Sequence, residues 1–80
     1  MQKTLETKKD SHLAPAILRI PQVKSRTGLG RSSLYAKLNP KSPYYDSTFP
    51  HPIRISARAV GWLESEISAW ITMRISSGRN

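Results

Sequence analysis

Basic side chains are the residues of this 80-residue chain whose number and placement point to chemistry. The chain carries 13 Lys and Arg against 5 Asp and Glu, which gives a formal net charge of +8. Residues 17–58 hold eight of the basic residues and a single acid, Asp46, which leaves this segment at +7. A polyanion binder concentrates charge in this way, because each cation that neutralises a phosphate also releases a condensed counterion. A basic surface kept only for solubility is the alternative interpretation.

The sequence contains no constellation that indicates catalysis or metal binding. His12 and His51 are isolated from other ligands, and no Cys is present for zinc, a disulfide or thiol chemistry. Glu64 and Glu66 are explained better by the start of a helix than by acid/base work. A chain of this length buries only about 60% of its unfolded surface. We therefore expect one domain that is not an enzyme, with no catalytic residues, no cofactor and no metal.

Two short helices are predicted after a polar tail. Residues 1–16 show no apolar period, and we expect them to form a disordered N-terminal tail. A helix is predicted over residues 21–27, because Pro21 suits a first turn and Gly28 suits the left-handed position after the last turn. A second helix is predicted over residues 31–38, closed by Asn-Pro.

A hairpin and a third helix complete the predicted domain. The alternation of apolar and polar residues over 53–62 predicts a hairpin with its tip near residues 56–59, one apolar side on a small core and Arg54 facing out. The prolines before Ile53 permit only an edge strand. Apolar residues spaced at helical intervals predict an amphipathic helix over 63–76 that lies behind any anion-binding face.

The second predicted helix has a face suited to DNA. Leu34 and Leu38 mark its buried stripe, which leaves the small residues Ser32, Ser33 and Ala36 opposite. Small residues allow a helix to approach base edges in a major groove, while longer cationic or hydroxyl side chains reach phosphates. An ordinary solvent-exposed face is the alternative. The flanking side chains are Arg31, Tyr35 and Lys37.

The hairpin and the loop before it offer further candidates. Arg54 and Arg58 occupy the positions of a DNA-contacting wing, with a charge-protected edge strand as the alternative. The segment 41–48 is predicted as a loop, and Lys41 within it is a candidate phosphate contact. We expect Tyr44 and Tyr45 to pack on the core, although stacking on a ribose or base is also open.

The order of helix, tight turn, helix, loop, hairpin and helix predicts a compact winged helix-turn-helix, mainly α with a small β-hairpin, over residues 17–77. Several spaced motifs within residues 18–75 resemble the AlpA family of prophage transcriptional regulators, which belongs with the excisionase-like and MerR-like domains. The strongest are FPHPIRI at 49–55 and GWLESEI with AW at 61–70, together with IPQV, TGL and RSSLY at 20–35. Three features depart from the family pattern. Gly30 stands where Ser or Thr usually caps the second helix, the loop 39–48 is longer than in many relatives, and the tail lies outside the match.

The resemblance implies a DNA-binding regulator that controls integrase expression or excision. It implies a recognition helix over 31–38 in the major groove and a wing on the neighbouring backbone or minor groove. It also places Arg26 on a phosphate near the turn. The full set of expected DNA-binding residues is Arg26, Arg31, Ser32, Ser33, Tyr35, Lys37, Lys41, Arg54 and Arg58.

Two alternatives to a transcriptional role stay open. One is an excisionase-type directionality factor that bends attachment-site DNA, and the other is a protein-interaction module or antirepressor. The expected partner is double-stranded DNA, with integrase or RNA polymerase as protein partners. No apolar run is long enough to span a bilayer and the N-terminal residues are polar, so we expect a cytoplasmic, nucleoid-associated protein of bacteria. The sequence shows no heptad repeat or spare apolar face that indicates a stable dimer. Any interaction between copies is expected only as cooperative binding to repeated sites.

Overall fold

The structure is a computed structural model that describes residues 15–78. It contains three helices and a three-stranded antiparallel sheet with strand order β1-β3-β2. The elements are β1 (Ile17–Leu18), α2 (Ile20–Thr27), α3 (Arg31–Leu38), β2 (Ile53–Ser56), β3 (Ala59–Leu63) and α4 (Glu64–Gly78). The chain is thus mainly helical with a β wing, and the predicted winged helix-turn-helix is confirmed.

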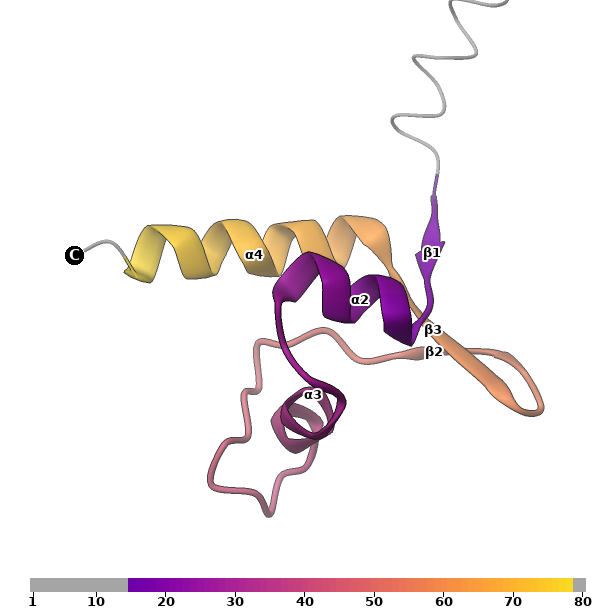
Figure 1. Cartoon of the computed structure of the whole chain (residues 1–80), viewed down its shortest axis with the longest axis horizontal. Helices are drawn as coiled ribbons and strands as arrows, with labels where there is room; N and C mark the ends of the chain where they lie inside the picture. Colours follow the sequence, from indigo (N-terminus) through magenta and orange to yellow (C-terminus); the bar gives the residue numbers. More distant parts are fainter. Residues whose placement is uncertain (1–14, 79–80) are drawn as a thin grey trace, which may run out of the picture.

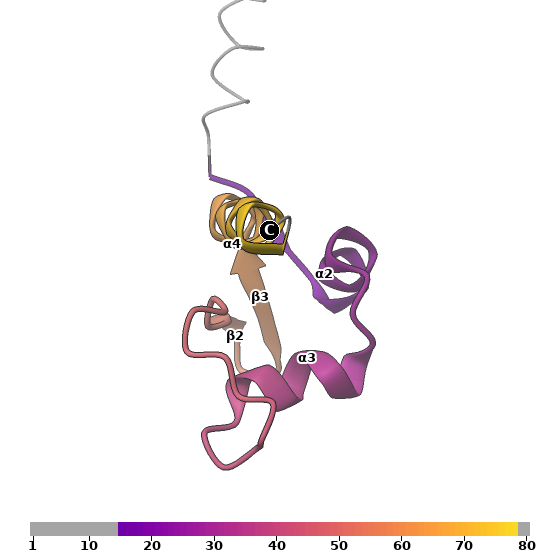
Figure 2. The same cartoon turned by 90° about the vertical axis from the view of Figure 1, so that its left-hand side faces the viewer.

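Figure 1 shows α2 lying alongside α4, while the hairpin of β2 and β3 projects past both helices. After a turn of 90°, α3 runs across the opposite end of the molecule from α4, and β3 descends between them (Figure 2). One edge of the molecule is therefore formed by α3 and the hairpin, with α4 behind them.

Local sequence signals set the ends of the first two helices. The backbone N–H of Arg19 donates to Oε1 of Gln22 at 2.8 Å, which closes the start of α2. Gly28 adopts φ 77°, and its N–H donates to the carbonyl of Lys24 at 2.8 Å. Gly30 precedes α3 in an extended conformation without a side-chain cap. The predicted helices over 21–27 and 31–38 are confirmed.

The core lies between α4, α2, α3 and the inner face of the sheet. Trp62 is fully buried, and its indole N–H donates to the carbonyl of Pro50 at 3.1 Å. The rings of Phe49 and Trp70 meet edge to face, with centroids 5.0 Å apart. The buried residues are Leu18, Val23, Leu34, Phe49, Trp62, Ile67 and Trp70.

The strand β1 was not predicted, because two residues are too few for any periodicity to register. Ile17 pairs with Leu63 and Leu18 with Trp62. The N–H of Glu64 then donates to the carbonyl of Ala16 at 2.8 Å. Leu63, predicted as the first residue of the last helix, is instead the last residue of β3. The tail predicted over 1–16 lies outside the described residues up to residue 14, as do residues 79–80.

The two faces of the hairpin are the reverse of the prediction. Arg54 pairs with Val60 across the strands, so both side chains lie on the face that carries the buried Trp62. Ile53 pairs with Gly61 and lies on the opposite face, and Ile55 reaches the same glycine. The expectation that the isoleucines pack on the core is therefore wrong, because the core already takes the alternate residues of β3.

The tyrosines of the loop are also more exposed than predicted. Tyr44 is 72% exposed and Tyr45 is exposed as well, whereas Phe49 enters the core in their place. A backbone hydrogen bond ties the loop to α3 instead, since the N–H of Asp46 donates to the carbonyl of Lys37 at 3.0 Å. Within residues 15–78, no helix has the length and apolar character that a membrane crossing requires.

Candidate nucleic-acid interface

The outward face of α3 is small and open, as the sequence predicted. Leu34 points into the core and is fully buried, which leaves Ser32 and Ser33 exposed on the other side. These serines line a shallow depression of about 360 Å³ together with Leu29, Ala36, Lys37 and Tyr44. A helix with this face can approach the edges of base pairs closely, because no long side chain stands between its backbone and the groove.

Arg31 stands at the N-terminal end of this helix. Its guanidinium carbon lies 5.8 Å from the ring centroid of Tyr35, one turn further along α3. Such a cation–π contact limits the conformations of the arginine without neutralising its charge. Both side chains are exposed, so the charge is available to a phosphate or to the acceptors of a guanine.

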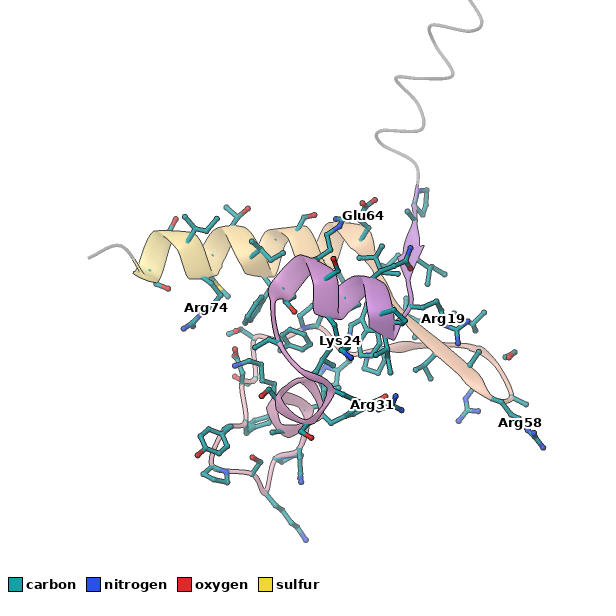
Figure 3. The ribbon with its side chains drawn as sticks, in the orientation of Figure 1. Arg19, Lys24, Arg31, Arg58, Glu64 and Arg74 are labelled. Atoms are coloured by element: carbon teal, nitrogen blue, oxygen red, sulfur yellow. The ribbon has the colours of Figure 1, made fainter. Side chains whose placement is uncertain are left out.

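The hairpin carries two more exposed cations. Arg58 lies in the turn between the strands, at the far tip of the projection (Figure 3). Nη1 of Arg54 is 3.4 Å from the carbonyl of Ala57, so its side chain folds back toward the same turn. In the loop after α3, Lys41 is also exposed, and its backbone N–H donates to Oδ1 of Asn39 at 3.0 Å.

Two cations beside this surface were missed by the sequence analysis. Arg19, Arg31 and Arg58 point toward the side of the molecule from which the hairpin projects, and Lys24 points from α2 toward α3 (Figure 3). None of the four forms an ion pair with another residue between positions 15 and 78. Arg19 and Lys24 were counted in the basic segment, but the signal that singles them out is their place beside α3, which only the fold provides.

The expected phosphate contact at Arg26 has an intramolecular partner instead. Nη2 of Arg26 lies 2.5 Å from Oε2 of Glu64 at the start of α4. The two side chains are 42% and 37% exposed, so the pair lies at the surface. Figure 3 shows Glu64 well away from Arg31 and Arg58. The position of Arg26 is therefore suited to joining α2 to α4.

Lys37 is likewise drawn toward the body of the protein. Its Nζ lies 5.6 Å from the ring centroid of Trp70, and the guanidinium carbon of Arg74 lies 5.9 Å from the same centroid. The indole N–H of Trp70 donates to Oδ2 of Asp46 at 3.1 Å. Lys37 thus belongs to a cluster that holds the loop against α4, although it also borders the depression on α3.

The carboxylates of Asp46 and Glu64 both have intramolecular partners. The hydroxyl and the N–H of Thr48 both donate to Oδ1 of Asp46, at 2.5 and 2.9 Å. The hydrogen bond from the Thr48 side chain is the main reason that the pKa of Asp46 lies below its ordinary value of 3.8, with Trp70 and Lys37 acting in the same direction. Glu66 borders a separate cavity on α4. The edge formed by α3 and the hairpin is left with positive charge.

Among residues 15–78, no group of three or more His, Cys, Asp or Glu residues is placed to hold a metal ion. Most of the expected DNA-binding residues are exposed on α3, the loop and the wing. They are Arg31, Ser32, Ser33, Tyr35, Lys41, Arg54 and Arg58. The arrangement can bind an extended anion, with small hydroxyl groups at its centre and cations around them.

Comparisons with known proteins bear on the same segment. Residues 16–75 match the family described as prophage CP4-57 regulatory protein (AlpA). The chain is 48% identical over 61 residues to the DNA-binding transcriptional activator AlpA of Escherichia coli K12, covering 76% of this chain and 87% of that relative. It is 34% identical over 59 residues to the uncharacterized protein ORF88 of enterobacteria phage P4, covering 74% of this chain and 60% of that relative. No solved structure matches the chain.

Proposed function

Because this chain belongs to the AlpA family of prophage regulatory proteins, we propose that it is a DNA-binding transcriptional regulator of a prophage or other integrated element. The observation that carries the proposal is the charge distribution around α3. Exposed cations on α2, α3 and the wing surround a small hydroxyl-bearing face, while the carboxylates of Asp46 and Glu64 have intramolecular partners. Double-stranded DNA is the extended polyanion that such a surface fits.

In the proposed complex, α3 enters the major groove and reads base edges. Ser32 and Ser33 lie at the centre of the contact and Arg31 at its start, where a bidentate pair with guanine provides discrimination. Tyr35 and Lys41 face the adjoining backbone. Arg54 and Arg58 on the wing contact the neighbouring backbone or minor groove.

Arg19 and Lys24 replace Arg26 and Lys37 as the proposed phosphate contacts near the helix-turn-helix. Arg26 gives up its ion pair with Glu64 in order to reach a phosphate. The Nζ of Lys37 is directed toward Trp70 of α4, whereas the ring that Arg31 contacts belongs to α3 itself. Arg19 and Lys24 have no such cost, since they form no ion pair within residues 15–78.

The proposed role is control of promoters that govern integrase expression or excision. The E. coli relative is named as a transcriptional activator, which favours this role over a purely architectural one. An excisionase-type factor would use the same surface to bend attachment-site DNA and recruit integrase. A promoter-reporter assay beside an excision assay separates the two, since a reporter that does not respond while excision proceeds would contradict the transcriptional role.

Selection from a random-sequence duplex pool tests DNA recognition itself. We expect enrichment of a single motif. The logarithm of the binding constant for that motif should fall by about 0.9 for each tenfold rise in salt concentration and for each phosphate contacted. The unselected pool is the control for sequence-independent binding. If the protein enriched nothing and shifted no duplex at low salt, the proposal would be wrong, and the basic face would be assigned to an acidic protein partner.

A further inference from the structure

The sheet has an apolar face that points away from the core and that no element between residues 15 and 78 covers. Trp62 and Leu18 define the inner face because both are buried, so their alternate neighbours define the outer one. Three isoleucines from the two edge strands surround Gly61 on this side. We call this surface the outer sheet face; it consists of Ile17, Ile53, Ile55, Ser56, Ala59, Gly61 and Leu63.

The outer sheet face is uncharged, apolar apart from Ser56, and partly open to solvent. Ile17, Ile53 and Ile55 are 46%, 37% and 44% exposed. The one charged residue of the three strands, Arg54, lies on the opposite face with Val60. Exposed apolar patches with polar surroundings mark contact sites in many proteins, and this one lies on a chain with a net charge of +8.

Gly61 brings the side chains of this face together. A Cβ placed on it would collide with Cγ2 of Ile17, and would come within 2.9 Å of the Leu18 carbonyl and 3.0 Å of Cδ1 of Ile55. The missing side chain allows isoleucines from β1 and β2 to meet over β3. The result is a continuous surface that can pack against another apolar surface.

The size and charge of this face restrict its partner. A standard stable interface buries roughly 800 Å² on each partner, more than a few partly exposed side chains on strands of two to five residues provide. Two free copies, each at +8, also repel one another. DNA removes both obstacles, because it neutralises the charge and holds two bound copies at high effective concentration.

We propose that the outer sheet face packs against the same face of a second copy when both copies occupy adjacent sites on DNA. This inference rests on the proposed DNA binding. Because the same surface is used by both copies, the contact is isologous and has a two-fold axis. The two sites must therefore be inverted repeats, and the contact appears as cooperativity rather than as a dimer in free solution.

The test uses duplexes that carry the motif selected from the random pool, as one copy, as two inverted copies at varied spacing, and as two direct copies. The variants are Ile53→Ser and Ile55→Ser, with Ile75→Ser as the matched control, since Ile75 is 50% exposed on α4 and lies outside the outer sheet face. Gel-shift titrations give the single-site affinity and the cooperativity separately. Sedimentation without DNA gives the oligomeric state.

We expect the wild-type protein to be a monomer without DNA and to bind one spacing of the inverted pair with cooperativity of roughly tenfold. Ile53→Ser and Ile55→Ser should lower the cooperativity factor, the ratio of paired-site to single-site affinity, toward one. They should leave the single-site affinity unchanged, while Ile75→Ser should change neither quantity. Cooperativity on direct repeats alone, cooperativity that survives both substitutions, or independent binding at every spacing would each overturn the inference. If the wild-type protein did not bind a single site, that result would instead contradict the proposed function.

Discussion

The guanidinium of Arg26 on α2 is bound to the carboxylate of Glu64 at the start of α4, across 38 positions of sequence. The contact joins two helices that lie side by side in Figure 1 and neutralises one cation of the helix-turn-helix. It thereby distinguishes Arg26 from the basic residues that form no ion pair within residues 15–78. Arg31, the first residue of α3, is one of the latter.

Arg26→Ala should reduce stability slightly and leave DNA affinity nearly unchanged. The pair is exposed, so we expect a coupling of less than about 1 kcal/mol in the free energy of unfolding. A double-mutant cycle with Glu64→Gln, followed by urea unfolding, measures this coupling. Titration of the selected duplex with the same variants measures affinity, and a loss as large as that of Arg31→Ala would show that Arg26 meets DNA.

Arg31→Ala and Arg19→Ala should affect DNA binding in different ways. Loss of a base contact at Arg31 should cost about 1–3 kcal/mol of discrimination between the selected motif and a single-base variant. Loss of a phosphate contact at Arg19 should weaken binding to both sequences equally and reduce the salt slope by about 1. Arg74→Ala is the control, since Arg74 lies over Trp70 on α4. Equal effects on both sequences from Arg31→Ala would place the reading helix elsewhere.

Gly61→Ala should destabilise the fold through crowding. The added methyl group meets the Leu18 carbonyl, which belongs to the backbone and cannot rotate away, so we expect a loss of about 1–3 kcal/mol in the free energy of unfolding. Gly78→Ala is the matched control, because nothing lies within 4 Å of the position of its Cβ. Denaturant unfolding of both variants checks the prediction, and equal stabilities would contradict it.

Acid should remove a stabilising contribution from Asp46. Its pKa is lowered in the folded state, mainly by the hydrogen bond from the Thr48 side chain. The ionised form is therefore the one that folding favours, and its contribution is fully present above the ordinary value of 3.8. The contribution is lost as the pH falls from that value through the lower folded-state pKa.

Urea unfolding of the wild-type protein and of Asp46→Asn between pH 6 and acid conditions measures this effect. The stability difference between the two proteins should shrink below pH 3.8, where the wild-type carboxylate also becomes neutral. Glu66→Gln serves as the control, since no hydrogen bond ties its side chain within residues 15–78. A difference that stays constant across this range would contradict the assignment.

The amino-acid sequence by itself determined the helices, the edge strand and the family. Pro21 and Gly28 bound α2, and the prolines before Ile53 confine β2 to the edge of the sheet, because these residues restrict the backbone within one or two positions. The apolar spacing over residues 63–76 predicted the amphipathic helix α4 for the same local reason.

Only the tertiary structure decided which cations are free and which way the hairpin faces. Arg26 finds Glu64, and Lys37 finds Trp70, because packing brings together residues far apart in the chain. Alternation in the sequence shows that a strand has two faces, but not which face meets the core. Trp62 settles that question for β3, since its large side chain fills the interior and turns Ile53 and Ile55 outward.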